Sequence, residues 1–154
     1  MTFDLQTVAK SLADYLAPYL PGVRFYEDPN QQGSQPPMLF LQLRFGRLYK
    51  ELGGYWVRHL GLDLVYLLDY NLPDLQQQYI AAGETLDQVL DTFPYSDGEN
   101  TRPLQCLERS WEIDLDALHY KFELRERVTL PAPETPTMQT LELHQTVKEA
   151  DHGQ

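Results

Sequence analysis

Few side chains in this sequence have the types and spacing that catalysis or metal binding requires. The four histidines lie far apart along the chain: His59, His119, His144 and His152. None has an acid–base partner at a typical spacing, so we interpret His59 and His119 as ordinary surface histidines on polar strand faces. The sequence also has no glycine-rich phosphate loop and no metal-ligand spacing.

Three further candidates have simpler structural explanations. Cys106 has no basic neighbour in the sequence, so it is predicted to be a small core residue. The pair Asp114 and Asp116 is typical of a hairpin turn. The Asp97-Gly98-Glu99 cluster lacks the other ligands of a calcium loop. We therefore expect no catalytic residue, no bound metal and no cofactor.

The strongest candidate is a binding surface at the tip of a long hairpin. Basic and aromatic residues of the types enriched at protein-binding hot spots are interleaved there: Arg47, Tyr49, Lys50, Tyr55, Trp56 and Arg58. The alternative is a solvated ribbon whose side chains only pair across strands, Tyr49 with Arg58 and Glu51 with Trp56. We favour an interface, because a protruding two-stranded ribbon is marginally stable alone.

The hairpin that carries this tip spans residues 37–70. Apolar residues occupy every second position of both strands: Leu39, Leu41, Leu43 and Phe45, then Leu60, Leu62, Leu64, Tyr66 and Leu68. A two-residue turn at Gly53-Gly54 would place Leu39 opposite Leu68 and Phe45 opposite Leu62. The same register pairs Arg44 with Asp63 and Gly46 with Gly61.

A second hairpin is predicted from residues 104–113 and 118–128, joined by a loop at 114–117. Its register pairs Trp111 with Tyr120 and Leu107 with Leu124, which gives aromatic and apolar cross-strand contacts. Arg109 is the exception, because it falls on the apolar face opposite Phe122.

The remaining elements are expected in this order: an amphipathic helix at 3–20 capped by Thr2 or Asp4, a strand at 23–27, a polar loop at 28–36, a helix from 74 to about 93 with Phe93 on its buried stripe, and a loop at 95–102. Together they predict an α+β fold, an antiparallel sheet built from two hairpins with two helices packed on one face. Residues 1–130 are expected to form a single domain. Several prolines then predict a linker and C-terminal arm at 131–154.

Composition limits the possible partners. The net charge of −11 argues against general nucleic-acid binding, which needs a basic face. A single cysteine excludes an internal disulfide and fits a reducing compartment. We expect no signal peptide, because the N-terminus has no basic region followed by an apolar run. We expect no membrane span, because no apolar stretch approaches the ~20 residues needed.

The stretch from Val23 to Leu41 resembles the signature of small phage tail terminator proteins. The matching positions, including one near the end of the chain, are Tyr26, Glu27, Gln32, Gly33, Pro37, Phe40 and Met138. The similarity extends over about residues 3–148, where the order of helix, strand, strand pair, helix, hairpin and short arm agrees with that family. The chain departs from the family in its Pro36-Pro37 pair, its acidic composition and its C-terminal tail.

This resemblance implies a structural, non-enzymatic protein of a phage or phage-tail-like particle, assembled in the bacterial cytoplasm. Such proteins form a ring, typically a homohexamer, on the head-proximal end of the tail tube, where they stop tube polymerisation and join the tail to the head connector. The implied partners are further copies and the tail tube protein, with sheath and connector proteins as further candidates. Membranes and specific nucleic-acid sequences are not among them. The hairpin tip and the C-terminal arm, with Met138 and Leu141, are the implied contact elements.

Two other interpretations stay open. A head–tail adaptor or a tail tube protein would share the size and the strand-rich build. Tails made without the protein separate these cases, since overlong tubes indicate a terminator and absent tubes a tube protein. A small cytoplasmic ligand-binding or enzymatic domain would need a pocket with convergent polar groups, and the sequence indicates none.

Overall fold

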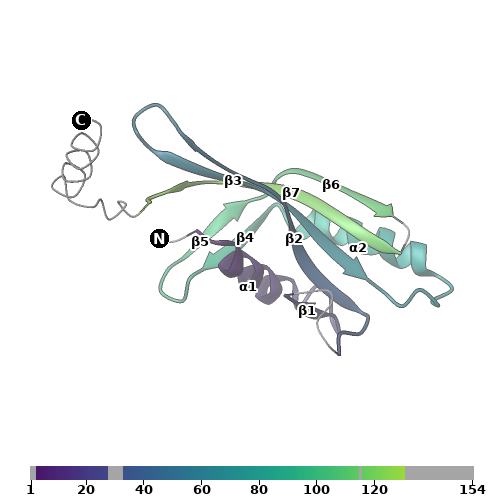
Figure 1. Cartoon of the computed structure of the whole chain (residues 1–154). Helices are drawn as coiled ribbons and strands as arrows, with labels where there is room; N and C mark the ends of the chain where they lie inside the picture. Colours follow the sequence, from purple (N-terminus) through teal and green to yellow (C-terminus); the bar gives the residue numbers. More distant parts are fainter. Residues whose placement is uncertain (1–2, 28–32, 115, 131–154) are drawn as a thin grey trace, which may run out of the picture.

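The computed structural model describes residues 3–27, 33–114 and 116–130, and these form an α+β fold (Figure 1). Its elements are α1 (Leu5–Leu16), β1 (Arg24–Tyr26), β2 (Met38–Lys50), β3 (Trp56–Leu67), α2 (Leu75–Val89), β4 (Thr92–Ser96), β5 (Thr101–Gln105), β6 (Leu107–Asp114) and β7 (Ala117–Val128). One sheet has the order β1-β2-β3-β7-β6, and β4 pairs with β5 in a second. The pairing is antiparallel except between β1 and β2. The predicted fold class is confirmed, with one parallel edge strand added.

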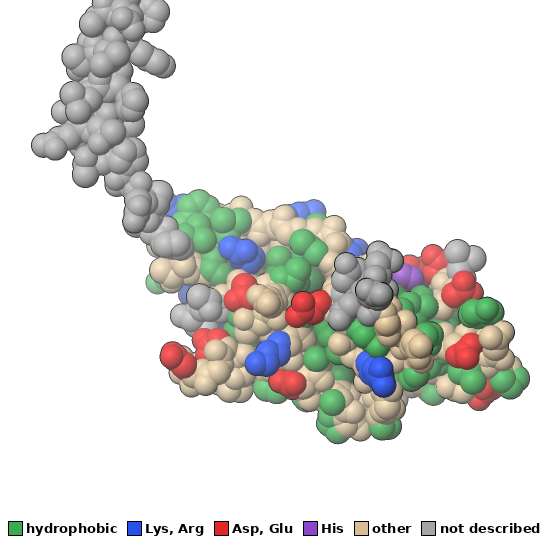
Figure 2. Space-filling model, turned by 60° about the horizontal axis from the view of Figure 1, so that its bottom comes forward, with side chains coloured by type: hydrophobic (Ala, Val, Ile, Leu, Met, Phe, Trp, Pro, Cys, Tyr) green, Lys and Arg blue, Asp and Glu red, His purple; other side chains and the backbone are tan. Residues whose placement is uncertain are grey.

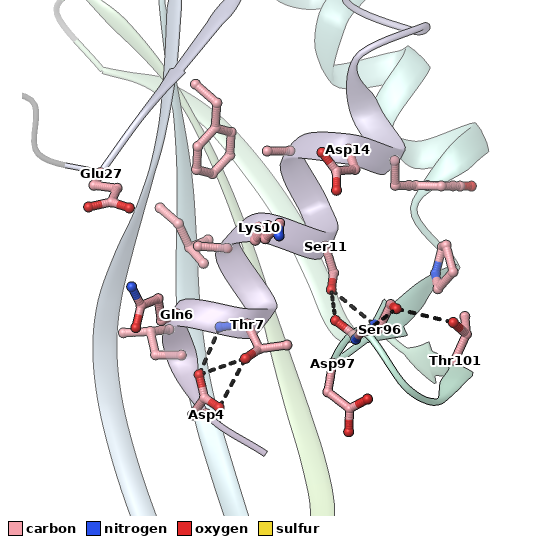
Figure 3. Close-up of a pocket in the computed structure, with 18 of the residues that line it drawn as sticks. Asp4, Gln6, Thr7, Lys10, Ser11, Asp14, Glu27, Ser96, Asp97 and Thr101 are labelled. Atoms are coloured by element: carbon pink, nitrogen blue, oxygen red, sulfur yellow. Dashed lines mark hydrogen bonds between the residues drawn. The ribbon is translucent and has the colours of Figure 1, made fainter. Parts of the chain in front are cut away.

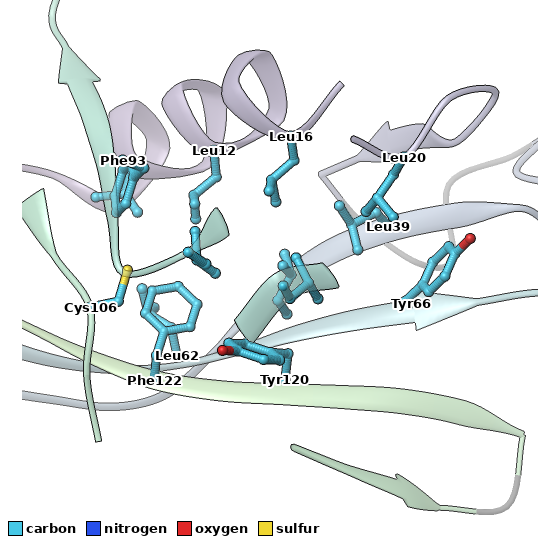
Figure 4. Packing of buried hydrophobic residues seen from close by; sticks show 14 of the residues in the cluster. Leu12, Leu16, Leu20, Leu39, Leu62, Tyr66, Phe93, Cys106, Tyr120 and Phe122 are labelled. Carbon is cyan, nitrogen blue, oxygen red and sulfur yellow. The ribbon is translucent and has the colours of Figure 1, made fainter. Parts of the chain in front are cut away.

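Both helices pack on the same face of the five-stranded sheet. Figure 4 shows Leu12 and Leu16 of α1 pointing toward Leu62 and Phe122 of the sheet, and these residues belong to one buried cluster. The β4–β5 hairpin lies beside α1 in this second layer (Figure 1) and contributes Phe93 to the same cluster. The leucine face of the long hairpin therefore covers the apolar stripes of the helices, as predicted.

Helix α1 begins as predicted but ends earlier. The Asp4 side chain caps it, because its Oδ1 accepts a hydrogen bond from the Thr7 N–H at 2.8 Å. The helix ends at Leu16 rather than near Leu20 because Pro18 has no N–H and restricts the residue before it. In the described part of the chain, neither helix is long and apolar enough to cross a membrane.

The predicted continuation of the second helix to Phe93 is wrong, and so is the loop at 95–102. Helix α2 ends at Val89, and Phe93 and Tyr95 are buried on alternate positions of β4. Pro94 disfavours helix here, and the period-two burial is that of a strand. The turn from β4 to β5 is formed at Asp97, whose carboxylate accepts from the backbone N–H of Glu99 and Asn100. These bonds lower the pKa of Asp97.

The second hairpin is correct at its turn end and shifted at its other end. Trp111 pairs with Tyr120 as predicted, but Leu107 pairs with Glu123 instead of Leu124. The shift comes from a bulge at Glu108 and Arg109, in which Glu108 has a φ of 50°. The predicted strand 104–113 is also divided, since its first part pairs with β4 and Cys106 separates it from β6.

The bulge explains why an arginine belongs on the helix-covered side of the sheet. Arg109 Nη1 donates to the Asp87 carbonyl oxygen at 2.8 Å, and its Nη2 lies 3.7 Å from Asp91 Oδ1. A cation is favourable there because the carbonyl groups at a helix C-terminus carry partial negative charge. Arg109 therefore anchors the end of α2 to β6.

The first hairpin has the predicted faces over its base but a different register. Leu39 pairs with Tyr66 and Leu43 with Leu62, so the predicted Leu39–Leu68 pair is wrong. The predicted Arg44–Asp63 and Gly46–Gly61 pairs are also wrong: Gln42 lies opposite Asp63, and Gly46 lies opposite Leu60. Two features cause this shift, a turn longer than two residues and a bulge at Arg44.

Candidate functional site

The predicted binding tip belongs to a three-stranded arm. Strands β2 and β3 extend past the helix layer, and the end of β7 extends with them (Figure 1). Trp56 pairs with Lys50 on one side and with Val128 on the other. We call residues 45–60 together with 123–128 the arm. The sequence predicts a two-stranded ribbon here, and the third strand makes the arm more stable than that prediction assumes.

The bulge at Arg44 determines which side chains share a face of the arm. Beyond it, Phe45 lies on the face away from the helices, because it pairs with Gly61 and not with Leu62. This corrects the prediction that Phe45 shares a face with Leu43. The predicted contact residues are divided accordingly: Arg47 and Tyr49 on the outer face, Lys50, Trp56 and Arg58 on the helix-side face, and Tyr55 in the turn.

On the outer face, Phe45 organises its neighbours. Its ring lies over Gly61, where an added Cβ would be only 2.1 Å from the Phe45 ring. The ring meets His59 edge-on at 5.1 Å between centroids, and the Arg47 guanidinium carbon lies 4.7 Å from its centroid. These contacts hold Arg47 in a defined position, since a cation over an aromatic face is attracted by the ring.

A second contact between an arginine and an aromatic ring forms nearer the turn. The Arg127 guanidinium carbon lies 4.6 Å from the centroid of the Tyr55 ring. Val57, which pairs with both Tyr49 and Arg127, is only 2% exposed, although it lies far along the arm. Tyr55 itself stays 53% exposed. The outer face of the tip is therefore packed and ordered, yet it presents an aromatic ring and cations to solvent.

The helix-side face joins the arm to the body. Arg102 of β5 forms an ion pair with Glu126 of β7. Nearer the tip, Lys50 Nζ lies 5.7 Å from the centroid of the Trp56 ring, and Leu48 is 44% exposed. Arg58 is half-buried, and its Nε has no hydrogen-bond partner among the described residues. On this face, the part of the arm nearest the body is attached to β5, and the tip carries apolar and positively charged side chains.

The turn requires its two glycines. Gly53 and Gly54 have φ angles of 95° and 84°, which other residues rarely adopt. Glu51 N–H donates to the Tyr55 carbonyl oxygen at 2.7 Å and closes a turn longer than the predicted one. Leu52 at its apex is 100% exposed.

The arm also carries free strand edges. β1 pairs only with Met38–Phe40 of β2, and β6 pairs with β7 no further than Glu123. Beyond those points, each strand has one edge without a described partner strand. Unpaired backbone N–H and C=O groups on such an edge can bind another strand.

The histidines on the outer face are paired with acids. His59 is 7% exposed and its Nε2 lies 2.5 Å from Glu123 Oε1. His119 Nδ1 lies 2.8 Å from Asp63 Oδ2. The prediction of a surface His59 is therefore wrong, because Phe45 and β7 cover it. The sequence gives no direct signal of this pair, since β3 and β7 are far apart in the chain.

Cys106 is a core residue, as predicted. It is 4% exposed, and burial raises the pKa of its thiol to about 12, so it is a poor nucleophile. Burial, followed by the hydrogen bond to Asp87, raises the pKa of the Tyr120 hydroxyl. Within the described ranges, no three acidic, histidine or cysteine side chains are grouped to hold a metal ion.

An open groove of about 1320 Å³ runs along α1 (Figure 3). Figure 3 shows Asp4 bonded to Thr7 at the start of the helix and Ser11 bonded to Ser96 of β4. These bonds cap the helix and attach it to β4. Lys10 and Asp14 point into the groove from the exposed side of α1. The groove is thus shaped by contacts that hold α1 in place.

The two remaining predicted contact residues, Met138 and Leu141, lie outside the described residues. Among the predicted residues that the structure describes, the arm brings together all six. It adds Phe45, Arg125 and Arg127, which sequence reasoning missed because the bulge and the β3–β7 pairing place them there.

The chain is similar to a known family of proteins. A family model described as phage tail terminator protein matches residues 6–136. No curated protein matches the chain. The matched span includes α1 from its second residue, all of α2 and the complete arm.

Proposed function

The chain belongs to the phage tail terminator family, and on this premise we propose that it forms a closed ring of identical copies on the head-proximal end of a tail tube. Membership of the family makes it a structural component of a phage tail. In the proposed role, the ring stops polymerisation of the tube and joins the tail to the head connector. The tail tube protein and a second copy are its immediate partners, and sheath and connector proteins are further candidates.

The proposal rests on the strand edges of the arm. Its outer edges belong to two different strands, β2 and β7, and each has a stretch without a described partner. A contact between unlike surfaces is heterologous, and it closes into a ring when the rotation between copies returns to the start. In a closed ring, the neighbouring subunits already occupy the contact surfaces of every copy. No further copy can add to such a ring, so a ring bound at the end of a tube can stop its growth.

The residues at the tip support an interface. Tyr55 and Leu52 are exposed, and cations accompany the aromatic rings on both faces. Exposed apolar and aromatic side chains gathered in one place mark interaction surfaces. The arm is therefore the proposed contact with a ring neighbour or with the tail tube.

The double variant Tyr55→Ala and Trp56→Ala tests this proposal. We expect a folded protein, because neither side chain belongs to the main buried cluster. Association should weaken by a few kcal/mol, the scale of aromatic hot spots, and tails should become overlong. Mass photometry and electron microscopy of tails provide the two measurements.

Tyr19→Ala is the matched control, because Tyr19 is 43% exposed on the body and lies outside the arm. It should leave both measurements at the wild-type value. Normal oligomers together with normal tail lengths in the double variant would show that the tip is solvated surface. Tails made without the protein should be overlong, whereas absent tubes would identify a tube protein instead.

A further inference from the structure

Three arginines share the outer face of the arm. Arg47 of β2 pairs with His59, which pairs in turn with Arg125 of β7, and Arg127 follows two residues later on the same face. All three are exposed. Among the described residues, none of the three forms an ion pair with a carboxylate. We call Arg47, Arg125 and Arg127 the arginine face.

The structure holds this charge in place without neutralising it. Phe45 and Tyr55 fix Arg47 and Arg127 through ring contacts at 4.7 and 4.6 Å. Glu123 is the acidic side chain of β7 on this face, but it lies 2.5 Å from His59. Gathered like charges repel one another unless an acidic partner is present, so an ordered arginine face fits a surface of opposite charge.

The same chain carries such a surface at the opposite end of the same strands. β7 begins directly after Asp116, so Asp116 and Arg125 are separated by nine residues, roughly 30 Å of strand. Tyr79 brings the end of β3 to this site, because its hydroxyl accepts from Leu68 N–H and donates to the Asp116 carbonyl oxygen. Four exposed aspartates surround this point: Asp69, Asp74, Asp114 and Asp116. We call them the aspartate end.

Asp69 and Asp74 lie in a stretch without basic residues. From His59 to Thr101 the chain contains no lysine or arginine. On the side of Asp114 and Asp116, Lys121 is already paired with Glu112 at 2.7 Å. On the face seen in Figure 2, the end of the molecule away from the arm shows acidic side chains and no lysine or arginine. In contrast, six of the 12 basic residues lie in the arm or at the bulge beside it: Arg44, Arg47, Lys50, Arg58, Arg125 and Arg127.

We propose that the arginine face of one copy docks on the aspartate end of a second copy, so that subunits join head to tail. This inference rests on the self-association proposed above and specifies its charged contact. The two surfaces are different and lie at opposite ends, so every copy can use both at once. Such a heterologous contact produces a ring when it closes. Local complementarity offsets the repulsion between chains that each carry −11.

A charge-swap experiment tests the proposal. Arg125→Glu with Arg127→Glu should raise the dissociation constant of the oligomer about 100-fold, the scale of close charge pairs across interfaces. Asp114→Lys with Asp116→Lys should do the same. The chain carrying all four changes has the wild-type net charge and should associate within about 10-fold of wild type. Analytical ultracentrifugation over a range of NaCl concentrations measures each constant, and association of the wild type should weaken with salt.

Lys10→Glu with Arg24→Glu is the matched control. Both residues are exposed outside the two surfaces, and the change in net charge equals that of the arginine pair. This control should associate like the wild type. Circular dichroism checks folding, and Arg125→Gln with Arg127→Gln replaces the reversal if that variant does not fold.

Two results would overturn the inference while leaving the ring proposal intact. One is wild-type association in both reversal pairs. The other is retention of a short DNA duplex that is lost with the arginines while the oligomer stays unchanged, since the arginine face would then serve a nucleic acid. A wild-type protein that stays monomeric at all concentrations, even with tail tubes, would instead contradict the proposed function.

Discussion

Gly83 lies in the middle of α2, where glycine costs about 1 kcal/mol relative to alanine. The structure gives the reason for it: a Cβ there would lie 2.7 Å from the Trp111 indole. The indole cannot shift freely, because its Nε1–H donates to Asp87 Oδ2 at 2.9 Å. We therefore expect Gly83→Ala to lower the free energy of unfolding by about 1–3 kcal/mol despite its better helix propensity. Urea denaturation measures this change.

The Trp111→Leu background separates packing from propensity. With the indole removed, Gly83→Ala should be neutral or stabilising by up to about 1 kcal/mol. Equal destabilisation in both backgrounds would mean that Trp111 is not the cause.

At the scale of elements, the Tyr79 hydroxyl joins β3, α2 and the β6–β7 turn. It accepts a hydrogen bond from Leu68 N–H at 3.0 Å and donates one to the Asp116 carbonyl oxygen at 2.6 Å. Tyr79→Phe removes both bonds and leaves the buried Leu68 N–H and the partly buried Asp116 carbonyl oxygen unpaired. We expect a loss of about 2–4 kcal/mol in the free energy of unfolding, since each buried unpaired group costs about 1–3 kcal/mol. Thermal and urea denaturation measure it.

Tyr15→Phe provides the comparison. The Tyr15 hydroxyl donates one bond, to the Val89 carbonyl oxygen at 2.6 Å at the end of α2. It serves a single partially exposed contact, so its loss should cost about 1 kcal/mol. An equal loss of unfolding free energy in both variants would mean that the Tyr79 hydroxyl does not stabilise the junction of β3, α2 and the β6–β7 turn more than an ordinary hydrogen bond does.

Elements with strong periodicity are predictable from this sequence, and their ends and pairings are less so. The stripe of α1 places Leu12 and Leu16 in the core, and the alternation in β3 and β7 does the same for Leu62 and Phe122. Two residues predicted on these apolar faces are exposed, Tyr19 at 43% and Leu43 at 50%. The β4–β5 hairpin is missed because Phe93 also fits the helical stripe of α2, and Pro94 is the signal that separates the two interpretations. The register of the long hairpin fails for a different reason, since a bulge at Arg44 and an extended turn leave no mark in an alternating pattern.

The candidate site is predictable in its location and not in its geometry. The interleaved basic and aromatic residues at 47–58 all lie in the arm, and their role as a contact surface stays a prediction from their residue types. The division of these residues between two faces depends on the bulge. The arginine face depends on β3 pairing with β7, which joins His59 to Arg125 across 66 positions of sequence. Such long-range pairs carry no local signal.

At the scale of the whole molecule, the arm is the part whose surroundings change most if the ring forms. Strand β3 is flanked by β2 and β7 along the arm, whereas β2 has one edge beyond Phe40 that no described strand pairs with. Backbone amides on a free edge exchange with solvent faster than amides between two strands. In the monomer we therefore expect amides of residues 45–50 to exchange faster than those of residues 57–60.

Assembly should reduce that difference in exchange rate if neighbouring copies bind the arm. We expect residues 45–50 and 124–128 to gain protection when the protein concentration rises above the dissociation constant, while the already protected β3 amides change little. Hydrogen-exchange mass spectrometry below and above that concentration measures both sets in one experiment. Peptides covering the exposed side of α1 are the internal control, because they lie on the body and should exchange alike in both states. Protection that appeared over α1 and left the arm unchanged would place the contact between copies on the body, and the arm would then be an exposed extension of the sheet.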